Sequence, residues 1–171
     1  LYNKNENKIY IARDKFGQKP LYYYKDKNFF IFSSDLKLFY DFFNDLNISK
    51  ANMEIFLDLS YLPSHLSIFE NVKKVIPGTF LEFNLVNQKI LKNIYWDINK
   101  IKRTIIPKQE DKLITQCENI LTESINKTLS SDVPVSFYLS SGVDSSLICA
   151  LSKKKLGIDV KTYTLSSNDA E

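Results

Sequence analysis

A short hydroxyl-rich segment, 140–146, holds the residues of this chain with the clearest chemical use. It reads Ser-Ser-Gly-Val-Asp-Ser-Ser and lies between an apolar run, 133–139, and a helix-like run, 147–156. In a strand–loop–helix arrangement, the free amides and the positive dipole end of the helix would face the loop and favour an anion. Gly142 would let the backbone approach a ligand closely or adopt a positive φ. The segment therefore predicts a phosphate site.

Asp144 is the acidic residue of this segment. A carboxylate next to phosphates is repulsive unless Mg²⁺ lies between them, and the alternative is that Asp144 caps the helix. A helix cap without any ligand is the simpler interpretation of a Ser-rich loop, but the apolar strand before it and the helix after it favour a binding loop. The segment is not a Walker phosphate loop, because no Lys follows Gly142.

The composition is that of a globular domain: 171 residues, 44% hydrophobic and 25% charged. The net charge of +3 and the scattered lysines argue against a nucleic-acid surface, and no apolar run approaches the roughly 20 residues of a membrane helix. Cys117 and Cys149 fall in helical patterns; two buried thiols would indicate a reducing cytoplasm, and neither is expected to be catalytic. Both ends, Leu1 and Glu171, suggest a segment of a longer protein.

The first hundred residues have a strand-rich pattern. Alternating and aromatic runs predict three strands that form a meander: 8–14, 21–24 and 29–33. Helical periodicity and the apolar pattern then predict two helices, 36–43 and 51–59, and a hairpin of 79–83 with 89–95. Arg13 and Asp14 suggest an ion pair that steadies the turn after the first strand. Gly78 suits a turn with positive φ, and His65 is expected to be an ordinary surface residue.

The remaining residues predict the beginning of an open α/β sheet. Residues 99–109 are polar and indicate a linker. A helix follows from Glu110, with a buried apolar stripe at Leu113, Ile114, Cys117, Ile120, Leu121 and Ile125. The apolar run 133–139 predicts a strand inside a parallel sheet, Gly157 would end the second helix, and 160–165 predicts a second strand. In such sheets, ligands bind beyond the carboxyl ends of the strands.

Several motifs resemble those of glutamine-hydrolysing asparagine synthetases. S-D-V-P-V at 131–135 and L-S-S-G-V-D-S-S at 139–146 are similar to the approach and pyrophosphate loop of that family, with Ser141 in place of the first Gly of its commonest motif. Four further segments resemble its glutaminase domain: R-D-K-F-G-Q-K-P-L-Y-Y at 13–23, F-S-S-D-L-K at 32–37, I-F-E-N-V-K-K-V-I-P-G at 68–78 and Y-W-D at 95–97.

The resemblance implies two partial domains. Residues 1–100 would be the C-terminal, α+β part of an N-terminal-nucleophile glutaminase domain. Residues 101–171 would begin an α/β pyrophosphate-loop synthetase domain of the adenine nucleotide α-hydrolase-like type. Such enzymes release ammonia from glutamine, adenylate aspartate with ATP and Mg²⁺, and let ammonia displace AMP. The nucleophilic N-terminal Cys is not in this chain, so the segment alone is expected to be inactive and no catalytic residue is assigned. The resemblance also implies a cytoplasmic enzyme of small-molecule substrates (aspartate, glutamine and ATP), with a homodimer left open.

The same resemblance assigns site residues. The phosphates would be held by Ser140, Ser141, Gly142, Asp144 and Ser145, with Asp144 also the ligand of Mg²⁺. Tyr138 and Leu139, at the end of one predicted strand, and Leu165, on the next, are placed to contact adenine or ribose. Three alternatives stay open: a β-lactam synthetase-like relative with another acceptor, a non-catalytic nucleotide-binding module, and an RNA-modifying member of the pyrophosphatase group, which the low net charge disfavours.

Overall fold

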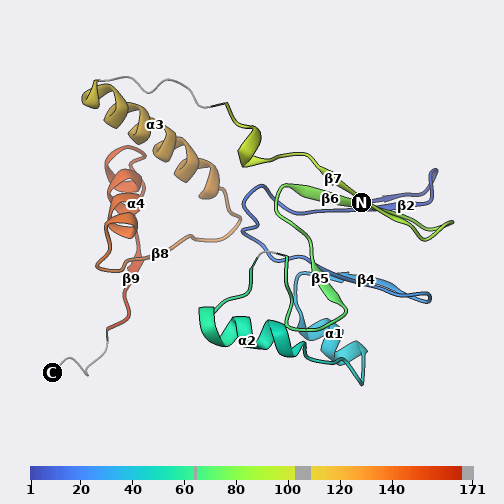
Figure 1. Ribbon diagram of the computed structural model, residues 1–171. Helices are drawn as coiled ribbons and strands as arrows, with labels where there is room; N and C mark the ends of the chain where they lie inside the picture. The colour runs from blue at the N-terminus through green and yellow to red at the C-terminus, as the bar shows by residue number, and fades with distance from the viewer. Residues whose placement is uncertain (64, 103–108, 167–171) are drawn as a thin grey trace. The chain divides into compact units, whose positions relative to one another are not determined.

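The computed structural model describes residues 1–63, 65–102 and 109–166 (Figure 1). The chain divides into two compact units, Leu1–Lys102 and Arg103–Glu171. Residues 103–108 of the predicted linker lie outside the described residues. Its first two residues, Asn99 and Lys100, belong to a short 3-10 helix, η1 (Ile98–Lys100). Among the described helices, none combines the length and the apolar character needed to cross a bilayer.

Two antiparallel sheets form the first unit. The larger sheet has the order β1 (Tyr2–Asn3), β2 (Lys8–Ala12), β6 (Thr79–Asn84), β7 (Ile90–Ile94). The smaller has the order β4 (Phe30–Ser33), β3 (Tyr22–Lys25), β5 (Val72–Lys74). The chain leaves the larger sheet after β2, builds the smaller one with its helices, and returns as β6 beside β2 (Figure 1).

The predicted strands are present, but the meander is wrong. β3 and β4 form a hairpin as expected, with Tyr23 opposite Phe32. β2, however, pairs with β1 and β6 instead of β3. The second neighbour of β3 is β5, in a segment for which no strand was predicted. The predicted hairpin of β6 and β7 is confirmed.

Alternation along β6 builds the core between the sheets. Thr79, Leu81 and Phe83 are buried, and the residues between them are half-exposed, as expected when one face of a sheet is covered. Leu81 packs with Ile11 and Val75, and these three side chains are 1–5% exposed. Complete burial of such a side chain is worth about 1.5–3 kcal/mol.

A second cluster covers the other face of the smaller sheet. Phe39, on helix α1 (Lys37–Phe42), packs against Phe69 and Val72. Helix α2 (Lys50–Leu59) begins at Ser49, whose Oγ accepts a hydrogen bond from the Asn52 amide at 3.3 Å. Both helices agree with the predicted ones within one residue at each end. In Figure 1 they lie on the side of the smaller sheet that faces away from the larger one.

The turn after β2 is fixed by a buried arginine. Arg13 is 9% exposed, and its guanidinium donates to the carbonyl oxygens of Val75 (2.8 Å), Gly17 (2.9 Å) and Lys19 (2.9 Å). The Asp14 carboxylate accepts from backbone amides of the same turn, including that of Gln18, and these bonds lower the pKa of Asp14. Main-chain bonds, rather than the expected Arg13–Asp14 ion pair, therefore connect both side chains to the turn.

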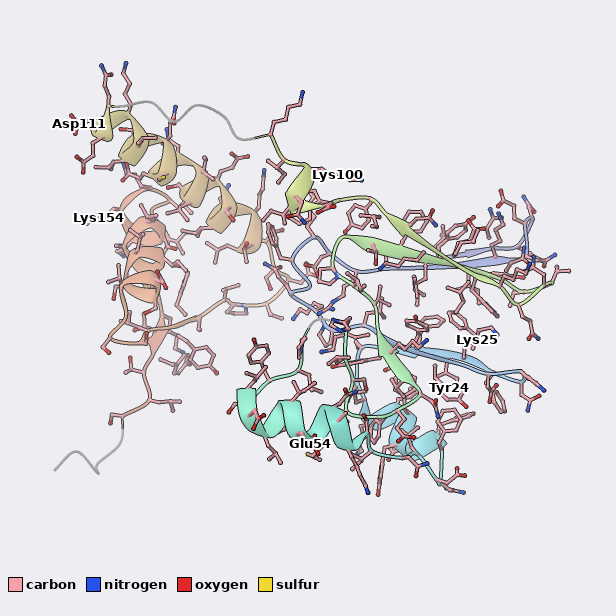
Figure 2. The ribbon with its side chains drawn as sticks, in the orientation of Figure 1. Tyr24, Lys25, Glu54, Lys100, Asp111 and Lys154 are labelled. Carbon is pink, nitrogen blue, oxygen red and sulfur yellow. The ribbon has the colours of Figure 1, made fainter. Side chains whose placement is uncertain are left out.

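The second unit contains helices α3 (Glu110–Thr128) and α4 (Val143–Lys154) and two short strands, β8 (Phe137–Tyr138) and β9 (Thr162–Tyr163). The strands pair in parallel, as predicted. Asp111 lies in the first turn of α3 and Lys154 in the last turn of α4 (Figure 2), where their charges suit the helix dipoles.

The second unit differs from the sequence prediction in length and burial. Both strands are shorter than expected: residues 133–136 are not in a strand, and Val133 is 68% exposed. Helix α4 begins at Val143 instead of Leu147. Of the predicted stripe of α3, only Ile125 is buried, and Cys117 is exposed, so the expectation of two buried thiols is wrong.

Candidate functional site

The hydroxyl-rich segment lies where β8 passes into α4. The Leu139 amide donates to the Tyr163 carbonyl at 2.9 Å, which extends the parallel pairing to the start of the loop. The Thr164 hydroxyl donates to the Leu139 carbonyl at 2.7 Å. The loop thus follows the carboxyl end of β8, next to the carboxyl end of the parallel strand β9, and this is the position where open α/β sheets bind ligands.

Ser145 closes the loop through its hydroxyl. Its Oγ lies 2.9 Å from Ser140 Oγ and accepts from the Ser140 amide at 3.2 Å. The same hydroxyl lies 3.2 Å from the carbonyl oxygens of Ser140 and Gly142. Ser140 Oγ in turn accepts from the Gly142 amide at 3.2 Å. The hydroxyls of Ser140 and Ser145, predicted as phosphate donors, therefore hold the loop in shape.

The start of α4 presents donors without internal acceptors. The first helical hydrogen bond runs from the Ser146 amide to the Gly142 carbonyl at 3.3 Å. In the described part of the chain, the amides of Val143, Asp144 and Ser145 have no acceptor. Three amides at the positive end of a helix suit an anion.

Gly142 is the N-cap residue of α4, with φ −77° and ψ 153°. A positive φ, one of the two roles predicted for it, is therefore wrong. A Cβ at this position would come within 3.2 Å of Ser140 Oγ, closer than most such contacts. Close packing against Ser140, together with unhindered access to the amides, accounts for a glycine here.

Asp144 is the second residue of α4 and is exposed. Asp144 does not cap the helix, because the N-cap residue is Gly142 and no side chain makes a capping hydrogen bond at this end. Among the described residues, no group of three or more His, Cys, Asp or Glu side chains could hold a metal ion by itself. A single exposed carboxylate can hold Mg²⁺ only together with other oxygen ligands, such as the phosphate oxygens that free amides would bind.

The three residues expected near adenine or ribose lie at or just beyond the ends of the paired strands β8 and β9. Tyr138 is 84% exposed and Leu165, which lies beyond the end of β9, is 94% exposed. Leu139 is half-buried and follows Tyr138, so their side chains point to opposite sides of the strand. Tyr138, Asp144 and Ser145 border a cavity of about 610 Å³, whose other walls include Leu121, Ile125, Ile148 and Cys149. The sequence prediction missed these apolar walls, because their periodicity indicates only a helix core.

The loop geometry separates two serines by their roles. Replacing Ser145 by Ala would remove the hydroxyl that closes the loop. If this loop binds ATP as the sequence predicts, the apparent KM for ATP of the complete protein should rise about tenfold, the equivalent of ~1.4 kcal/mol. Ser141 makes no side-chain hydrogen bond among the described residues, so Ser141→Gly should change this KM less than threefold. Steady-state kinetics of the two variants checks the difference, and equal effects would contradict these roles.

Comparison with known proteins identifies the family of the N-terminal part of the chain. The model of the glutamine amidotransferase domain matches residues 1–96, more than half of the chain. The chain belongs to the glutamine amidotransferase domain family. The model named asparagine synthase matches residues 116–171, so the amidotransferase domain is followed by the start of an asparagine synthase domain.

Individual proteins that are similar to this amidotransferase-family chain are consistent with the two family matches. "Asparagine synthetase 1, glutamine-hydrolyzing" of Bacillus subtilis is 32% identical over 154 residues, which are 90% of this chain and 24% of that protein. A protein of Methanocaldococcus jannaschii that also carries an asparagine synthetase name is 34% identical over 169 residues, 97% of this chain and 32% of its own length. "Amidase chry2" of Gibberella zeae is 29% identical over 154 residues, 88% and 22% of the two chains. The chain thus spans a quarter to a third of the first relatives it matches, and the resemblance to glutamine-hydrolysing asparagine synthetases is confirmed.

Proposed function

We propose that the complete protein is a glutamine-hydrolysing asparagine synthetase. The observation that supports this most is the order of the two matches: an amidotransferase domain, and then the start of an asparagine synthase domain that contains the loop at 140–146. Residues 1–100 would be the end of an N-terminal-nucleophile glutaminase domain, and residues 101–171 the beginning of a pyrophosphate-loop domain.

In this proposal the loop binds the phosphates of ATP. The free amides of Val143, Asp144 and Ser145 donate to phosphate oxygens, and the backbone amide of Ser141 adds a donor from the other side of Gly142. Ser140, Gly142 and Ser145 hold these donors in place. The geometry supports this division of roles, because the hydroxyls of Ser140 and Ser145 already bond to each other at 2.9 Å.

Asp144 would hold Mg²⁺ at the same end of the helix. When bound, the ion supplies the positive charge that offsets the charge of the leaving pyrophosphate. The loop keeps the phosphates in line while the aspartate carboxylate attacks the α-phosphorus and pyrophosphate leaves. Ammonia from glutamine then displaces AMP and gives asparagine. Tyr138, Leu139 and Leu165 are proposed to approach the base or ribose.

The complete protein tests this directly by exchange of labelled pyrophosphate into ATP. We expect exchange that depends on aspartate, and asparagine formation from glutamine. If the protein binds ATP but shows no exchange with any acceptor tested, it is a non-catalytic nucleotide-binding module and the synthetase proposal is refuted.

A second candidate is a related amide-forming enzyme with another acceptor. Two relatives named amidases, 29% and 27% identical over 88% of this chain, support this second candidate. They show that proteins with names other than asparagine synthetase contain a segment similar to this chain. It predicts that exchange is absent with aspartate and appears with another carboxylic acid. A panel of amino acids in the same assay separates the two candidates.

A further inference from the structure

Two lysines stand on the inner faces of the two sheets, each on an edge strand. Lys73 of β5 is opposite Tyr23, and Lys92 of β7 is opposite Leu81. Tyr23 and Leu81 both belong to the hydrophobic cluster between the sheets. Residues that are directly opposite on neighbouring strands share a face of the sheet. The register therefore places both lysines on the faces that meet, where apolar residues are the rule.

Both lysines border one small cavity between the sheets, which we call the inter-sheet pocket. Its volume is about 190 Å³, which is room for an ion of four or five heavy atoms. It is lined by Tyr23, His65, Lys73, Lys74, Val75, Ile76, Thr79, Leu81 and Lys92. No Asp or Glu is among these described lining residues. Lys73, Lys92 and His65 are exposed, so an ion from solution can reach them.

The surroundings of the pocket are also positive. Arg13 donates to the carbonyl oxygen of Val75, one of the lining residues, at 2.8 Å. Burial, and then the charge of Arg13, lower the pKa of Lys74. Positive charges that lie close together repel one another, and an anion bound in the inter-sheet pocket would reduce this repulsion.

A hydroxyl donor completes the pocket. Tyr23 is half-buried, and burial raises the pKa of its phenol, which therefore stays protonated at neutral pH. In the described part of the chain, no acceptor is found for this hydroxyl. The other hydroxyl of the pocket, that of Thr79, already donates to the Ile76 carbonyl at 2.6 Å.

We propose that the inter-sheet pocket binds a small oxyanion, a phosphate or a carboxylate group, between Lys73 and Lys92, with the Tyr23 hydroxyl as a further donor. The site lies in the amidotransferase unit and does not depend on the loop at 140–146. The competing explanation for the two lysines needs no ligand: inward-facing charges on edge strands prevent unwanted strand pairing.

Calorimetric titration of the complete protein with inorganic phosphate tests the proposal. Ionic strength is kept constant with sodium chloride, and α,β-methylene-ATP occupies the nucleotide loop beforehand. We expect one phosphate site whose Kd rises at least tenfold in the variant Lys73→Gln/Lys92→Gln and several-fold in Tyr23→Phe. Lys89→Gln, an exposed change in the β6–β7 turn outside the pocket, is the matched control and should leave the Kd unchanged.

A parallel titration with sodium acetate identifies the group. Binding of acetate alone assigns a carboxylate ligand, binding of phosphate alone assigns a phosphate ligand, and binding of both supports the shared oxyanion chemistry. If neither anion binds, or if the double lysine variant binds both as the unmodified protein does, the pocket is not an anion site and the lysines only protect the strand edges. Because the loop is filled in every titration, failure here leaves the synthetase proposal untouched.

Discussion

Asp144→Asn in the complete protein is expected to lower aspartate-dependent ATP–pyrophosphate exchange by about 10²- to 10³-fold, the equivalent of ~3–4 kcal/mol in the activation barrier. The amide keeps the size of the side chain and removes the negative charge proposed to hold Mg²⁺. Because Asp144 is exposed and makes no capping bond, the fold should be unaffected. Initial rates at saturating ATP, with the melting temperature measured alongside, check both statements.

The matched control is Asp159→Asn. Asp159 is a fully exposed carboxylate in the same unit, 3.5 Å from the Lys153 ammonium. A surface ion pair of this kind contributes at most about 1 kcal/mol, so exchange should stay within twofold of the unmodified protein. If Asp144→Asn also kept full exchange activity, Asp144 would have no place in the metal and phosphate site.

Gly78→Ala is expected to lower the local free energy of unfolding around β6 and β7 by about 3–4 kcal/mol. Gly78 has φ +67°, a conformation that costs an alanine about 1–2 kcal/mol. A Cβ there would also overlap the carbonyl oxygen of Trp96. This backbone cannot move freely, because the Tyr95 and Trp96 amides both donate to the Gly78 carbonyl, at 3.0 and 3.1 Å. Hydrogen exchange of the Leu81 and Phe83 amides should become more than a hundredfold faster.

Gly157→Ala separates strain from overlap. Gly157 also has φ +67°, but a Cβ there would meet no atom within 4 Å. Only the cost of the left-handed conformation applies, about 1–2 kcal/mol, and exchange of the Leu151 amide in α4 should rise about tenfold. Equal losses at the two glycines would mean that the contact with Trp96 contributes nothing.

The sequence predicts local structure in the first unit better than strand pairing. Alternation and helical stripes locate β2, β3, β4, α1, α2 and the β6–β7 hairpin, because each pattern comes from neighbours along the chain. It does not predict that β2 pairs with β6, since alternation shows that a strand has a buried face and not which strand lies beside it. β1 and β5 have two and three residues, too few for a periodic pattern.

The sequence predicts which residues form the candidate loop, but it does not predict which of them bind a ligand and which of them hold the loop in shape. Polar Asp144, Ser145 and Ser146 suggest a loop, yet side chains of this kind are also favourable in the first turn of a helix, where α4 contains them. The apolar run 133–139 predicts a buried strand, but Pro134 lacks the amide that a central strand needs, and only Phe137–Tyr138 pairs. That Ser145 bonds to Ser140 depends on the loop conformation, which no spacing rule gives.

The excursion from β2 to β6 has a consequence for the order of folding. Ile11 pairs with Leu81, so the central strands of the larger sheet meet only after a long loop has closed, whereas β3 and β4 are joined by a short turn. Closing a long loop is entropically costly, and pre-formed structure within the loop shortens it. We therefore expect the β3–β4 hairpin to form first, β5 to join it, and β2–β6 pairing to follow as the slow step. Pulse-labelled hydrogen exchange during refolding would show protection at Tyr23 before Ile11, and the reverse order would exclude this route.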